Sequence, residues 1–226
     1  VPEGAVRSKL AAIEAYGAVL HRCAPTIASR EAAAAAVQAD TGATLVHPYT
    51  DPRVIAGQGT AALELLAEAG PLDVLITPLG GGGLLAGSAI TGRARGGEGL
   101  AILGAEPEGA ADGFESLRQG RHVTDLVPDT VCDGLRGTLG APNFALLQRH
   151  GVRVLTATDT QVVAAMRLLW QRGKLLVEPS SAVALAIVLA HPAEFAGKRV
   201  GIILSGGNVD LDALPALFAP CAEEVP

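Results

Sequence analysis

The chain has 226 residues, of which 49% are apolar and 18% charged, and its formal net charge is −6. This length is enough to bury a core without disulfides or metal sites, and so few charges among so many apolar residues exclude a disordered chain. The acidic balance argues against a general nucleic-acid binder, because such a protein needs a basic face.

The cysteines and the apolar runs indicate in which cellular compartment the protein is expected. Cys23, Cys132 and Cys221 are far apart and form no C-x-x-C pair, which argues against a disulfide framework or a zinc site and favours a reducing, cytoplasmic setting. The most apolar run, 182–190, is about half as long as a membrane span. The first residues lack the basic and apolar regions of a signal peptide. We therefore expect no contact with a membrane.

Strand and helix patterns alternate along the chain. Ser29 is expected to cap a helix that runs through 32–36, and the spacing of Thr158 and Gln161 predicts a capping box for a helix that Gly173 ends. Nearly continuous apolar runs, typical of buried parallel strands, occur at 44–47, 74–77, 101–105, 153–156 and 200–204. This alternation predicts an α/β fold, a parallel sheet with helices on both faces. The turn at 50–52 is the expected boundary between two lobes.

Four consecutive glycines, Gly80–Gly83, lie between a predicted strand and a predicted helix. Backbone N–H groups without side chains can converge on an anion there, and a helix N-terminus favours negative charge. The loop therefore predicts a phosphate site. One interpretation is a dinucleotide site in an NAD-linked oxidoreductase, because Gly81-x-Gly83-x-x-Ala86 fits that fingerprint and Glu106 follows about twenty residues on.

Further motifs surround the loop in a fixed order: 47–60, 105–107, 132–135, 174–180 and 204–210. In this order they resemble the fold type II pyridoxal-phosphate (PLP) enzymes of the serine/threonine dehydratase and serine racemase family, over nearly the whole chain. The resemblance implies a tryptophan-synthase-β-like fold, with 1–50 as a remnant of the small lobe and 51–226 as the large PLP-binding lobe. It also implies a small amino-acid substrate and a homodimer.

The resemblance assigns the PLP site. Ser205 falls beside the pyridine nitrogen, where a neutral hydroxyl favours β-elimination over transamination. Glu178 is expected either to border the ring or to serve the dipole of the helix that follows it. The phosphate is assigned to the backbone amides of Gly80, Gly81, Gly82, Gly83 and Leu84.

A second constellation, Glu106, Ala110 and Asp112, places two carboxylates and a backbone carbonyl around one turn. Hard oxygen ligands of this kind suit Mg²⁺ or Ca²⁺, and racemase-like members of the family carry a divalent-cation site at matching positions. The alternative is a solvated acidic loop.

The chain departs from the family pattern in its lysines. Lys9, Lys174 and Lys198 all lack the Ser-x-Lys-x-Arg-Gly setting of the Schiff-base lysine that PLP chemistry needs, so we assign no catalytic residue. The Ser-Ser-Gly-Asn-His loop that holds the substrate carboxylate in relatives is also absent. We therefore expect a fragment that lacks an N-terminal part, with a natural lysine-free form as the alternative.

The sequence thus predicts a PLP-dependent ammonia-lyase that converts L-threonine or L-serine to a 2-oxo acid and ammonia in the intact protein. Gly137 stands where racemase-like relatives carry a serine, which favours a dehydratase over a serine racemase-type enzyme. A catalytically inert module that binds PLP or a nucleotide is a further alternative.

Overall fold

The computed structural model describes residues 1–5 and 7–219, and Cys221 lies outside these ranges. Within them, a central sheet holds four parallel strands in the order β3-β2-β1-β4. Four of the five predicted strands are confirmed, as is the parallel α/β class. The strands are β1 (Val74–Pro78), β2 (Ala101–Pro107), β3 (Arg153–Ala157) and β4 (Val200–Ile202).

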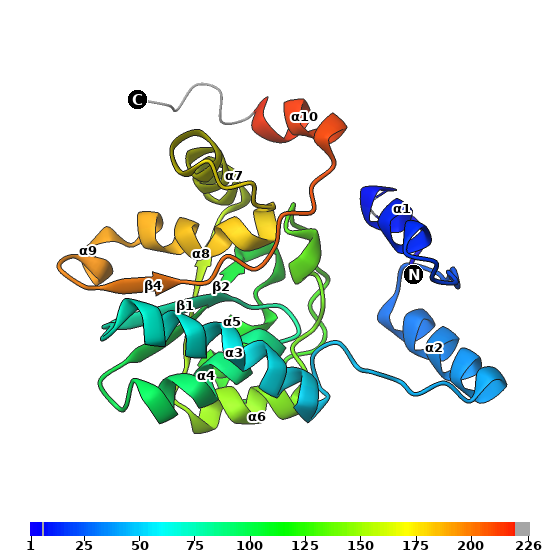
Figure 1. Ribbon diagram of the computed structural model, residues 1–226, viewed down its shortest axis with the longest axis horizontal. Coiled ribbons are helices and arrows are strands. Elements are labelled where there is room, and N and C mark those ends of the chain that lie inside the picture. The colour runs from blue at the N-terminus through cyan, green and yellow to red at the C-terminus, as the bar shows by residue number, and fades with distance from the viewer. Residues whose placement is uncertain (6, 220–226) are drawn as a thin grey trace.

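Helices cover both faces of this sheet, with α3, α4 and α6 on one side and α7 and α8 on the other (Figure 1). No helix within the described residues is long and apolar enough to cross a bilayer. The helices are α1 (Arg7–Ala15), α2 (Ile27–Thr41), α3 (Pro52–Ala69), α4 (Gly83–Arg95), α5 (Asp112–Gln119), α6 (Ala141–Arg149), α7 (Asp159–Leu168), α8 (Pro179–Ala190), α9 (Pro192–Phe195) and α10 (Leu214–Phe218).

The core consists of two apolar layers that the sheet separates. Successive strand side chains point to opposite faces, so Leu75 packs with α3 and α4, whereas Val74 and Ile76 pack with α7 and α8. All five residues of β1 are buried. This explains why the strand reads as a continuous apolar run, since a strand covered on both faces has no solvent side.

Two local predictions are wrong. Residues 44–47 form no strand and are mostly exposed, because a strand needs a neighbour to share its backbone hydrogen bonds and none of the described segments pairs with them. The N-cap of α2 is Thr26, whose side chain accepts from the backbone N–H of Ser29. Ser29 instead accepts from Ala24 within the first turn. The capping box at Thr158 and Gln161 is confirmed.

The first fifty residues contribute little to the core. Helices α1 and α2 stand apart from the sheet, and a long connection joins α2 to α3 (Figure 1). None of the residues in this part whose side chains are described is buried. A single parallel bridge, between Pro2 and Cys23, links its extended segments. The division into 1–50 and 51–226 stays a prediction.

Candidate functional site

The glycine loop lies at the carboxyl edge of the sheet, between β1 and α4. Gly82 has φ +91°, a left-handed conformation that favours glycine. Gly80, Gly82 and Gly83 are buried and Gly81 is half-buried. Crevices outside the carboxyl ends of parallel strands are the usual ligand sites of such sheets.

The amides of this loop are free to bind an anion. The backbone N–H groups of Gly80, Gly81, Gly82, Gly83 and Leu84 donate to no acceptor among the described residues. The first internal bond of the helix runs from Ala86 to the Gly82 carbonyl, which leaves the preceding donors unpaired. Buried N–H groups rarely lack a partner, so the loop offers donors to an anionic ligand.

Three neighbours hold the loop in this shape. The side-chain amide of the fully buried Asn143 donates to the carbonyls of Gly81 (2.7 Å) and Tyr49 (2.8 Å). The Gly140 amide also donates to the Gly81 carbonyl, at 3.1 Å. The Tyr49 ring occupies the space where a Cβ on Gly81 would lie. These contacts fix the carbonyl and the backbone of Gly81, while its N–H donates to no acceptor among the described residues.

Two other loops meet the glycine loop. Strand β4 pairs with β1, so the segment that contains Ser205 leaves the same edge of the sheet, where Ser205 is exposed. The backbone of Gly134 and Leu135 lies against Gly80. The backbone N–H of Glu178 donates to the Gly206 carbonyl at 3.1 Å. Glu178 therefore borders the space beside Ser205; it stands at the N-cap position of α8, but its side chain makes no capping hydrogen bond.

The structure also brings together Glu106 and Asp112, at the end of β2 and the start of α5. The carboxylate of Glu106 accepts from the amides of Gly113 (3.0 Å) and Phe114 (2.7 Å), and that of Asp112 accepts from Leu139 (2.8 Å). Burial raises the pKa of Glu106 well above its ordinary value, and the charge of Asp112 adds to this effect. Burial also raises the pKa of Asp112.

No lysine or arginine forms an ion pair with either carboxylate among the described residues. The described part of the chain contains no group of three His, Cys, Asp or Glu side chains that could hold a metal. The two acids, and the backbone carbonyl of the buried Ala110 between them in the sequence, offer hard oxygen atoms of the kind that suits Mg²⁺ or Ca²⁺. Each Glu106 oxygen accepts one backbone amide, and the side chain is fully buried.

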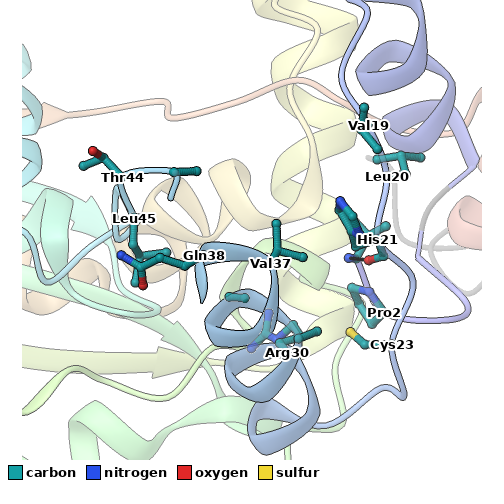
Figure 2. Close-up of a pocket in the computed structure, with 14 residues that line it drawn as sticks. Pro2, Val19, Leu20, His21, Cys23, Arg30, Val37, Gln38, Thr44 and Leu45 are labelled. Atoms are coloured by element: carbon teal, nitrogen blue, oxygen red, sulfur yellow. Dashed lines mark hydrogen bonds between the residues drawn. The ribbon is translucent and has the colours of Figure 1, made fainter. Parts of the chain in front are cut away.

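Among the cavities lined in part by α2 are two of similar volume. One of about 490 Å³ lies between α2 and the extended segments before it and after it, and none of the predicted site residues lines it. Figure 2 shows Arg30 and Val37 of α2 facing Pro2, His21 and Cys23 across this space. The other cavity, of about 450 Å³, is lined in part by Tyr49 and Gly140, which support the glycine loop.

A family model described as pyridoxal-phosphate dependent enzyme matches residues 1–206. The chain belongs to this family. The PLP enzymes most similar to it include the beta-hydroxyaspartate dehydratase of Paracoccus denitrificans, which is 45% identical over 95% of this chain and 68% of its own length. The L-threo-3-hydroxyaspartate ammonia-lyase of Saccharomyces cerevisiae is 43% identical over 97% of this chain and 67% of its own length.

Solved PLP enzymes share the fold. Maize serine racemase superposes with a TM-score of 0.89 at 36% identity, over 98% of this chain and 69% of its own. A threonine deaminase from T.th. superposes with a TM-score of 0.84 at 43% identity, over 90% of this chain and 67% of its own. The chain thus has the type II PLP fold and spans about two thirds of the relatives it matches.

Several residues that shape the site carried no distinct signal in the sequence. Tyr49 and Asn143 support the glycine loop from elements 94 residues apart, and no local pattern marks such a pair. Gly134 lies within the 132–135 motif, and nothing in that motif indicates that its backbone packs beside Gly80. The assignments of the phosphate to the loop, of Ser205 to the pyridine nitrogen and of a cation to Glu106 stay predictions.

Proposed function

We propose that this chain forms the cofactor-binding part of a PLP-dependent ammonia-lyase, or dehydratase, that acts on a small β-hydroxy amino acid and releases a 2-oxo acid and ammonia. The observation that carries the proposal is the row of buried and half-buried backbone amides from Gly80 to Leu84, which lack an acceptor among the described residues. When bound, PLP withdraws electrons from the Cα of the amino acid it carries. The family's relatives named as dehydratase, deaminase and ammonia-lyase support this reaction class.

Different residues of the chain would bind different parts of PLP. The amides of Gly80 to Leu84 would hold the phosphate, and the dipole of α4 behind them would favour its charge. The hydroxyl of Ser205 would donate to the pyridine nitrogen without protonating it. Tyr49 and Asn143 would keep the loop in its binding shape and exclude water from beneath it.

The lysines of this chain are poorly placed for the Schiff base. Lys9 is paired with two carboxylates. Lys198 is exposed and precedes β4, at the amino edge of the sheet, whereas the glycine loop lies at the carboxyl edge. The ammonium of Lys174 donates to the Gln171 carbonyl on the surface. We propose that the Schiff-base lysine belongs to a part of the polypeptide outside these 226 residues.

A cation site is part of the proposal. Glu106, Asp112 and the carbonyl of Ala110 would bind Mg²⁺ or Ca²⁺, because burial of two neighbouring acids without a cationic partner is unfavourable. Glu106→Gln should then abolish any stabilisation of the protein by millimolar Mg²⁺ or Ca²⁺. If the metal raises the melting temperature of the unaltered protein and of Glu106→Gln by the same amount, the cation site is wrong.

Racemisation is the second candidate. Relatives named serine racemase are 42% identical in Dictyostelium discoideum and 40% in Homo sapiens. Against this, Gly137 has no side chain to accept or donate a proton where racemase-like relatives carry a serine.

One assay of the complete polypeptide separates these candidates. L-Serine, L-threonine and L-threo-3-hydroxyaspartate would be supplied with PLP and Mg²⁺, and ammonia, 2-oxo acid and the D-enantiomer would be measured. The proposal expects equal amounts of ammonia and oxo acid from at least one substrate. D-Amino acid without ammonia would replace the lyase with a racemase, and PLP binding without any product would leave a binding module.

A further inference from the structure

Lys9, on the N-terminal helix α1, contacts two carboxylates near the glycine loop. Its ammonium lies 2.7 Å from a carboxylate oxygen of Asp133 and 3.4 Å from one of Glu178. Among the described residues, the two ion pairs of Lys9 connect residues 1–50 to the part of the chain after residue 50, and the other ion pairs lie within that later part. All three side chains are at least 70% shielded from solvent.

Both carboxylates belong to the loops that border the glycine loop. Asp133 begins a short helical turn, Asp133–Leu135, whose Gly134 amide donates to the Ser180 hydroxyl at 2.9 Å. That turn packs against Gly80. The carboxylate of Glu178 occupies the space where a Cβ on Gly206 would lie. One ammonium therefore touches the residues that shape two sides of the site.

The positive charge of Lys9 and the negative charges of Asp133 and Glu178 stabilise each other in this cluster. Burial raises the pKa of Glu178, the ammonium of Lys9 opposes that rise, and the charge of Asp133 adds to it. Burial lowers the pKa of Lys9, but the hydrogen bond to Asp133 and the charges of both acids outweigh it, so the net pKa is raised. Lys9 is thus held as a cation, which cannot attack an aldehyde. Without it, two acids would face each other at the site.

We propose that Lys9 is a positioning residue: by pairing with Asp133 and Glu178 it holds the 133–135 turn and the Glu178 carboxylate against the PLP site, and so couples α1 to cofactor binding. This inference rests on the proposed function. It assigns Lys9 a role through Glu178, with no covalent bond to the cofactor.

The test uses the complete polypeptide and its affinity for PLP, measured by equilibrium dialysis. It also uses the emission of Trp170, the single tryptophan of these 226 residues, read as the change between each variant and the unaltered protein. Trp170 is a local reporter, because its indole N–H donates at 2.9 Å to the carbonyl of Val177, the residue before Glu178. Lys9→Met should weaken PLP binding at least fivefold and shift the Trp170 emission. Lys9→Arg should restore both, and Lys198→Met, which removes an exposed lysine, should change neither.

A double variant tests the route through Glu178. If Lys9 acts by neutralising this acid, Lys9→Met combined with Glu178→Gln should bind PLP no more weakly than Lys9→Met alone. Additive losses would overturn the proposal, as would wild-type affinity and emission in Lys9→Met. Should the unaltered protein bind no PLP, the proposed function fails. The emission of Lys9→Met against Lys9→Arg would then still decide whether Lys9 holds the Glu178 segment.

Discussion

At the scale of single residues, Gly81 shows why the loop needs glycine. Its missing side chain leaves room for the Tyr49 ring, while its carbonyl is held by Asn143 and Gly140. A Cβ at this position would collide with the Tyr49 ring, and the loop would have to shift its backbone N–H groups away from the anion they are expected to bind. The run of glycines in the sequence predicts such a loop, but not that an aromatic ring fills the vacated space.

Gly81→Ala should therefore raise the dissociation constant of PLP at least tenfold, which corresponds to a loss of about 1.4 kcal/mol of binding free energy. Equilibrium dialysis of the complete polypeptide measures this. Gly99→Ala is the matched control, because nothing lies within 4 Å of a Cβ there. Unchanged affinity in Gly81→Ala would separate the loop from phosphate binding.

Cys132 illustrates the effect of burial on a thiol. It is fully buried, and this burial raises its pKa from 9.0 to about 12. The thiolate is the reactive form, so iodoacetamide at pH 8 should label Cys23, which is partly exposed, and leave Cys132 unmodified until the protein unfolds. Peptide mass spectrometry distinguishes the two. The stability that the buried thiol contributes is fully present below pH 9 and should fall as the pH rises from 9 towards 12, because only the unfolded chain ionises there.

At the scale of elements, sequence patterns predicted well wherever the signal is local. The capping box of α7 depends on residues three apart and is present. The Thr158 hydroxyl accepts from the backbone N–H of Gln161, and the Gln161 side chain accepts from the backbone N–H of Thr158. The strand expected at 44–47 failed because its formation depends on a neighbour in space. An apolar run within a segment cannot show whether that neighbour exists.

Thr158→Ala should lower the free energy of unfolding by about 1 kcal/mol, since the first turn of α7 loses its side-chain acceptor. Chemical denaturation measures the change. Thr60→Ala, an exposed position within α3, is expected to change the stability by less than about 0.5 kcal/mol. Equal losses in both variants would show that the cap is not the cause.

At the scale of the whole molecule, the core and the N-terminal part differ in how much they bury. Strands β1 and β2 lie between two apolar layers, whereas residues 1–50 have no buried side chain among those described. Local opening costs less where few apolar contacts must break. Lys9 is then the cationic link that ties this weakly packed part to the site.

Amide hydrogen exchange should follow this division. We expect the amides of β1 to exchange at least a hundredfold more slowly than those of α2 at neutral pH, as mass spectrometry of peptic fragments would measure. Similar protection in both would mean that residues 1–50 form a more stable unit than their burial indicates.

The sequence by itself determined the parallel α/β class, the glycine loop between β1 and α4, and the order of motifs that places the chain among PLP enzymes. These features can be read along the chain, because each strand pattern, the glycine loop and each motif consists of residues that are near one another in the sequence. Only the tertiary structure decided that Asn143 and Tyr49 hold the loop, that Glu106 and Asp112 share one buried turn, and that Lys9 reaches Asp133 and Glu178. Such contacts join residues far apart in the chain, and which of them form depends on how the layers pack around the sheet.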